Sequence, residues 1–180
     1  VADRIIGLQN VLAGRAAAPE QATAQQVMLS VTTSAAPSRP PLPTLALPAA
    51  PAAPNVDGRL DPAEWKAAAT VGNFLDIRDG APSRLATRAY AMADDMALYV
   101  ALDCPEPAMG KVAAKETQHD GTVWLEDGAE IFVGAASRET YAHVIVTTAN
   151  VVLDERNQDA QAWNPKLATA VQKRADGWSV

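Results

Sequence analysis

Alternating apolar and polar positions in the second half of the chain indicate a pair of antiparallel strands. Residues 87–93 (TRAYAMA) alternate, a polar Asp-Asp pair interrupts the pattern, and residues 98–102 (LYVAL) resume it. Two such runs with a short polar break between them are typical of a β-hairpin. Tyr90 and Tyr99 alternate with their strands, so we expect them to pair across the hairpin.

Short β-branched runs bounded by turn residues predict further strands. They lie at residues 131–133, 141–147, 151–153, 167–171 and 178–180. One brief helix is predicted at residues 61–68, with Asp61 as its N-cap and Pro62 in its first turn. No longer helix is expected after residue 70, so the pattern predicts an all-β fold, an antiparallel β-sandwich of the jelly-roll type.

The first 54 residues differ in composition from the rest. All nine aromatic residues lie after position 54, whereas eight of the thirteen prolines lie at or before it. A segment without aromatic residues cannot bury enough apolar surface to offset the entropy of ordering the chain. We therefore expect residues 1–35 to be a poorly ordered segment or the tail of a preceding domain. Residues 36–54 are a predicted semi-rigid Pro/Ala linker, and residues 55–180 are the predicted folded domain.

Charge and cysteine content exclude several classes of partner. Residues 55–180 carry 19 acidic and 12 basic residues without a Lys/Arg stripe, so we expect no nucleic-acid partner. The chain has no run of 18 apolar residues, so we expect no transmembrane helix and no membrane partner. The single cysteine, Cys104, excludes an intrachain disulfide and is expected to be a small buried apolar residue.

Both ends of the sequence indicate an internal piece of a longer protein. The chain begins with Val1 and shows no basic segment followed by an apolar one, as a signal peptide would. The last predicted strand runs to Val180 without a polar residue to end it. We therefore expect the folded domain to lack its final strands.

Sequence motifs for catalysis are absent. No serine lies in a G-x-S-x-G motif, and no glycine-rich phosphate-binding motif occurs. His119 and His143 have no other His or Cys at ligand spacing. Acid pairs such as Glu126 and Asp127 could serve a glycosidase, but adjacent acids on a strand point to opposite faces, and acids on turns are usually solvated. We therefore expect a binding domain and not an enzyme.

Residues 119–133 (HDGTVWLEDGAEIFV) place Trp124 among acidic residues at the start of a predicted strand. Water reaches such a position, which is unusual for a tryptophan of the core. The apolar face of a pyranose stacks on an indole, and carboxylates accept hydrogen bonds from sugar hydroxyls. The segment therefore indicates a sugar site; alternatively, Trp124 covers the end of the sandwich beside solvated acids.

The other tryptophans and His143 suggest different roles. Trp65 and Trp178 lie in segments typical of packing and are expected in the core. Trp163 lies in a predicted loop (QAWNP), where it could be a second sugar platform or an ordinary loop residue. His143 is expected to be a hydrogen-bonded histidine of the sheet and not a ligand.

Five segments resemble, in the same order, carbohydrate-binding modules of family 9 and their DOMON-like relatives. They are residues 55–65 (NVDGRLDPAEW), 89–100 (AYAMADDMALYV), 120–132 with the pattern D…W…D…E-I-F, 141–144 (YAHV) and 177–180 (GWSV). The resemblance covers nearly all of residues 55–180. It implies a β-sandwich that binds the terminal sugars of polysaccharides. Such a module is usually attached to a glycoside hydrolase, in an extracellular or periplasmic protein.

The same resemblance implies a sugar clamped between two tryptophans above a carboxylate. The first tryptophan corresponds to Trp124 and the carboxylate to Glu130, while the second tryptophan would lie beyond Val180. Asp127 is expected to add a hydrogen bond to the sugar. Bound calcium would be in keeping with such a module, although no acidic run has the ligand spacing of a calcium loop, and no other cofactor is expected.

Two alternatives remain open. Some DOMON-like relatives bind haem through Met, His or Lys and transfer electrons, for which Met92, Met109 and His143 are the candidates. In addition, Ile145 stands where sugar-binding members can have an arginine. The domain could therefore be a structural or interaction module with a degenerate sugar site.

Overall fold

The structure is a computed structural model that describes residues 44–134, 140–160 and 163–180. The chain divides into two units, Val1–Thr44 and Leu45–Val180, of which the second is described below. The predictions for residues 1–35 and for the first part of the linker lie outside the described residues. The last part of the predicted linker pairs with the folded unit: the Ala50 amide donates to the Ala93 carbonyl at 2.7 Å.

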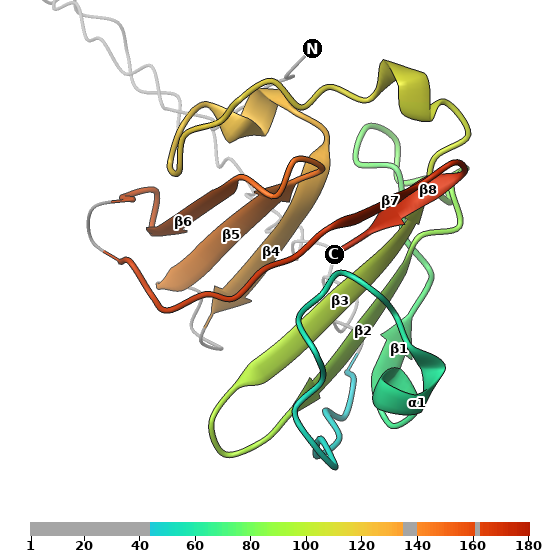
Figure 1. Ribbon diagram of the computed structural model, residues 1–180, viewed down its shortest axis with the longest axis vertical. Helices are drawn as coiled ribbons and strands as arrows, with labels where there is room; N and C mark the ends of the chain where they lie inside the picture. The colour runs from blue at the N-terminus through green and yellow to red at the C-terminus, as the bar shows by residue number, and fades with distance from the viewer. Residues whose placement is uncertain (1–43, 135–139, 161–162) are drawn as a thin grey trace, which may run out of the picture. The chain divides into compact units, whose positions relative to one another are not determined.

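Two antiparallel sheets form the second unit (Figure 1). The first has the order β1 (Ala69–Val71), β2 (Arg88–Ala93), β3 (Leu98–Pro105), β8 (Gly177–Ser179) and β7 (Gln172–Arg174). The second has the order β4 (Gly128–Gly134), β5 (Tyr141–Thr147) and β6 (Val152–Arg156). Three single turns of helix accompany them: α1 (Pro62–Trp65), η1 (Met109–Lys111) and η2 (Val123–Leu125). The prediction of an all-β fold is confirmed.

The predicted hairpin is present as β2 and β3, and local chemistry explains its turn. The Asp94 carboxylate accepts hydrogen bonds from the amides of Met96 and Ala97, both at 2.8 Å, which closes the reversal between the strands. The expected pairing of the two tyrosines is corrected. Tyr90 lies opposite Ala101 and Tyr99 lies opposite Met92, so the tyrosines are diagonal neighbours. The Tyr99 hydroxyl donates to Asp94 at 2.7 Å.

The predicted short helix is present, but it is shorter than expected. The N-cap is confirmed, because Asp61 accepts a hydrogen bond from the Ala63 amide at 2.8 Å, but α1 ends at Trp65 because β1 starts soon afterwards at Ala69.

The strand predicted at residues 167–171 is wrong. This segment turns where the Leu167 amide bonds the Pro165 carbonyl, and it then lines a cavity without joining a ladder.

Two apolar clusters lie on different sheets. In the first, Trp65 covers Met92 and Ala101 of the β2–β3 pair, and its ring meets Tyr90 edge-on with centroids 6.4 Å apart. Trp178 on β8 is also buried, so the prediction that Trp65 and Trp178 are core residues is confirmed. In the second cluster, Val123, Ile145 and Leu153 pack together and attach η2 to β5 and β6.

A cavity of about 560 Å³ is lined by apolar side chains from both sheets. The lining includes Leu98, Val100 and Leu102 of β3, Ile131 and Val133 of β4, Val144 and Val146 of β5, and Trp163. Side chains alternate across a strand, so neighbouring residues of β4 and β5 point to the opposite, outer face of the second sheet. We call the face of the second sheet that lines the cavity its inner face, and the opposite face its outer face.

Cys104 on β3 is half-buried, and so less buried than predicted. Burial, with a smaller contribution from the neighbouring Asp103 carboxylate, raises the pKa of its thiol to about 11. Cys104 is therefore an unreactive thiol at neutral pH. Within the ranges that the structure describes, the chain has no helix whose length and apolar character would let it cross a membrane.

Candidate functional site

The outer face of the second sheet carries a row of polar and aromatic side chains. Ile131 and Val133 line the cavity, so Glu130 and Phe132 point to the outer face. The strand register places Phe132 opposite His143 on β5, and His143 opposite Glu155 on β6. Three residues that are distant in sequence thus form one cross-strand row.

His143 is held on both sides by carboxylates. Its Nδ1 lies 2.8 Å from a Glu155 oxygen and its Nε2 lies 3.1 Å from a Glu130 oxygen. The Phe132 ring stacks on the imidazole, with centroids 4.0 Å apart and planes inclined by 7°. The prediction that His143 is a hydrogen-bonded histidine of the sheet is confirmed, because both ring nitrogens have partners. Phe132 itself is more than half exposed and presents its ring to solvent.

Trp124 lies on η2, and its side chain points away from the core. The residue is 56% exposed, while the preceding Val123 is fully buried against Ile145 and Leu153. The turn is therefore anchored by Val123 and presents the indole to water. Ile145 packs beneath this turn, which gives the residue a structural role at the position where the resemblance allowed an arginine.

The acids that follow Trp124 fix a neighbouring loop. A Glu126 oxygen accepts a hydrogen bond from the Lys115 amide, and an Asp127 oxygen accepts one from the Ala113 amide, both at 2.6 Å. Each carboxylate thus has a backbone partner that positions residues 113–116. Asp127 remains exposed to solvent beside these contacts.

The structure brings only some of the predicted site residues together. Glu130 contacts His143 on the outer face, and η2 attaches Trp124 to the same sheet through Val123. Trp163 is half-buried and lines the cavity, on the other side of that sheet. The four predicted residues therefore do not all share one surface.

The haem-ligand candidates are also separated. Met92 is fully buried in the Trp65 cluster of the first sheet, and Met109 is half-buried in η1. His143 lies on the second sheet between its two glutamates. The three candidates therefore lie in three different elements, β2, η1 and β5.

Sequence reasoning missed Phe132 and Glu155, and it also missed a second histidine cluster. Phe132 has a local signal, because it follows Glu130 by two residues on one strand and therefore shares its face. Glu155 has none, because its position beside His143 depends on strand register. The second cluster joins His119 and Asp120 to Asp154 on β6, 34 residues beyond Asp120, where no spacing rule would have paired them.

Comparisons with protein-family profiles, with curated proteins and with solved structures find no match for this chain.

Proposed function

We propose that this chain is a non-catalytic carbohydrate-binding module, with Trp124 as its principal sugar platform. The observation that carries the proposal is the 56% exposure of Trp124 on a turn whose neighbour, Val123, is fully buried. A large aromatic side chain exposed on an anchored turn loses little conformational freedom when a ligand stacks on it. The apolar C–H face of a pyranose is a ligand of suitable shape and chemistry.

The outer row of the second sheet supports the same chemistry. Phe132 offers a second exposed ring, and the half-exposed Glu130 carboxylate offers oxygens that accept hydrogen bonds from sugar hydroxyls. Stacking of Phe132 on His143 holds the ring in place before a ligand arrives. We assign Glu130 to hydroxyl recognition, with Asp127 in a supporting role and Trp163 in a separate, weaker contact.

The remaining parts of the proposal concern the parent protein. The two sheets form a β-sandwich of the DOMON-like type, and the module belongs to a larger extracellular or periplasmic protein that includes a glycoside hydrolase. Binding to the ends of a polysaccharide keeps the attached catalytic domain near its substrate by raising the effective concentration. Dissociation constants for single sugars lie between about 1 μM and 1 mM, or about −8 to −4 kcal/mol.

Isothermal titration calorimetry with mono- and oligosaccharides tests this proposal. We expect at least one of them to bind to the wild-type chain, and Trp124→Ala to reduce the affinity at least about tenfold, equivalent to about 1.4 kcal/mol. Leu125→Ala is the matched control, because Leu125 is exposed to a similar degree on the same turn but has no ring to stack. Absence of heat with every sugar, or equal losses in the two variants, would overturn the proposal.

A further inference from the structure

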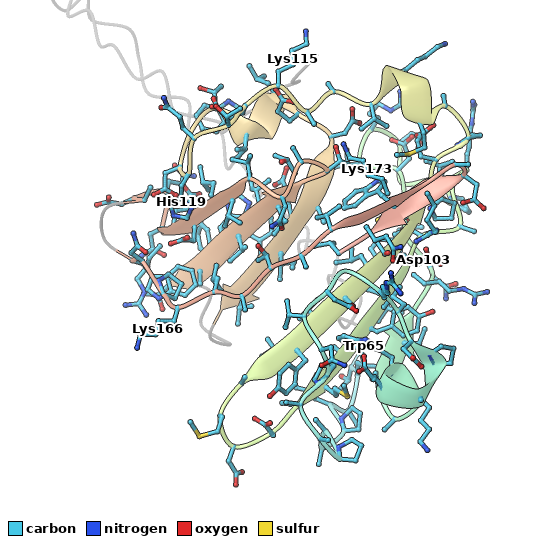
Figure 2. The ribbon with its side chains drawn as sticks, in the orientation of Figure 1. Trp65, Asp103, Lys115, His119, Lys166 and Lys173 are labelled. Atoms are coloured by element: carbon cyan, nitrogen blue, oxygen red, sulfur yellow. The ribbon has the colours of Figure 1, made fainter. Side chains whose placement is uncertain are left out.

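The second histidine cluster lies at the free edge of the three-stranded sheet. β6 is the edge strand, and Figure 2 shows His119 beside it. The Asp120 amide donates to the Val152 carbonyl at 2.9 Å, and the Asp154 amide donates to the Asp120 carboxylate at 3.1 Å. These two bonds, one to the backbone and one to the side chain of Asp120, attach the 119–120 turn to β6. They hold the Asp120 side chain next to that of Asp154.

The three side chains converge on one point. The same histidine nitrogen, Nε2 of His119, lies 3.1 Å from an Asp154 oxygen and 3.5 Å from an Asp120 oxygen. One ligand atom from each residue lies within 4.8 Å of the others. Ligand atoms bound at the usual distance to a tetrahedral zinc ion lie about 3.3–3.6 Å from one another. The cluster therefore needs only a small side-chain adjustment to surround such an ion.

Asp154 supplies an independent observation that points to a cation. Its side chain is 2% exposed, and its Oδ1 atom has no hydrogen-bond partner among the residues that the structure describes. A buried carboxylate whose oxygens are not all compensated is costly. The contacts of the described residues leave this buried carboxylate only partly compensated.

The cluster also has an open side. The His119 side chain is 51% exposed, so an ion can reach the site from solvent without rearrangement of the sheet. The same opening leaves room for water as a further ligand. The site thus combines the buried carboxylate of Asp154 with the solvent-accessible imidazole of His119.

We propose that His119, Asp120 and Asp154 bind a divalent zinc ion. An imidazole nitrogen with two carboxylates suits Zn²⁺ and similar transition-metal ions, whereas Ca²⁺ and Mg²⁺ prefer oxygen ligands throughout. The competing explanation is that protonated His119 alone bridges the two aspartates as an ion pair. This zinc site is independent of the proposed sugar surface, because it uses none of the residues assigned to sugar binding.

Calorimetric titration of the EDTA-treated 180-residue chain with ZnCl₂ tests the proposal. We expect one Zn²⁺ per chain, and at least about tenfold weaker binding in His119→Gln, Asp120→Asn and Asp154→Asn. That loss is typical even of residues that only support metal ligands. The matched control is His143→Gln, which removes the other carboxylate-flanked histidine and should change the zinc affinity by no more than about twofold. Addition of CaCl₂ should not displace the bound Zn²⁺.

Circular dichroism establishes that each variant is folded. If Asp154→Asn fails to fold, His119→Gln and Asp120→Asn decide, because both positions are at least partly exposed. Equal zinc affinity in wild type and His119→Gln, no saturable binding to the wild type, or loss of binding in His143→Gln would each overturn the site. Absence of zinc binding would establish the ion pair as the role of this cluster.

Discussion

The two histidine clusters of the second sheet contain the same kinds of group but arrange them differently. His143, in the middle of the sheet, contacts Glu155 through Nδ1 and Glu130 through Nε2, so its carboxylates lie on opposite sides of the ring. His119, at the sheet edge, faces Asp120 and Asp154 with the single atom Nε2. The first arrangement lets one imidazole bridge carboxylates on the two flanking strands, β4 and β6. The second leaves three ligand atoms around one space.

This difference shows that composition does not decide what a histidine–carboxylate cluster does. His143 is buried and stacked on Phe132, so its contacts stabilise the sheet. His119 is half exposed and has one fully buried aspartate behind it. Direction of the ring nitrogens and exposure together separate a structural bridge from a candidate ion site.

The largest expected effect comes from removing each histidine in turn. His143→Ala removes the ring stacked on Phe132 and leaves the mostly buried Glu155 without its partner, which should cost about 2–3 kcal/mol of unfolding free energy. His119→Ala in metal-free buffer should cost less, about 1–2 kcal/mol, because it removes the partner of the buried Asp154 but loses no ring stacking and leaves a space that water can fill. Urea unfolding followed by circular dichroism measures both. Equal losses would contradict the distinction between the clusters.

Neutralising the two partners of His143 should separate stability from binding. Glu155→Gln should cost about 1–2 kcal/mol of unfolding free energy, since Glu155 is mostly buried, whereas Glu130→Gln should cost about 0.5 kcal/mol because Glu130 is half exposed. In sugar titrations the order should reverse, with about tenfold weaker binding for Glu130→Gln only. A larger loss of sugar affinity in Glu155→Gln would remove Glu130 from the proposed site.

The smallest expected effect concerns Asp94, a carboxylate organised by donors without a histidine. The Tyr99 hydroxyl and then the amides of Met96 and Ala97 hold the pKa of Asp94 below its ordinary value. A lowered pKa means that the stabilisation is present above the unfolded-state value near 3.8 and is lost as the pH falls through the folded-state value. Asp94→Asn should therefore slightly reduce the acid dependence of unfolding below pH 4. Thermal unfolding at several acidic pH values measures this, and an unchanged pH profile would contradict it.

Local signals explain which parts of the fold could be predicted. β5 spans Tyr141–Thr147, the range predicted from its β-branched run, and the cap of α1 follows from Asp61 and Pro62. The strand predicted at residues 167–171 failed because an apolar run has the same composition whether it joins a ladder or lines a cavity. β1 and β7 were missed because each has only three residues and, unlike the equally short β8 with Trp178, carries no aromatic residue.

The sequence by itself determined that the chain is all-β after residue 55, that Trp65 and Trp178 are buried, and that Trp124 lies among acids at the entry to β4. Only the tertiary structure decided which carboxylates meet which histidine and on which side of the sheet Trp163 lies. The physical reason is the range of the interactions concerned. Caps, turns and alternation act over a few residues, whereas Glu155 reaches His143 through strand pairing, and Asp154 reaches His119 through a turn that bonds β6 from 34 residues away.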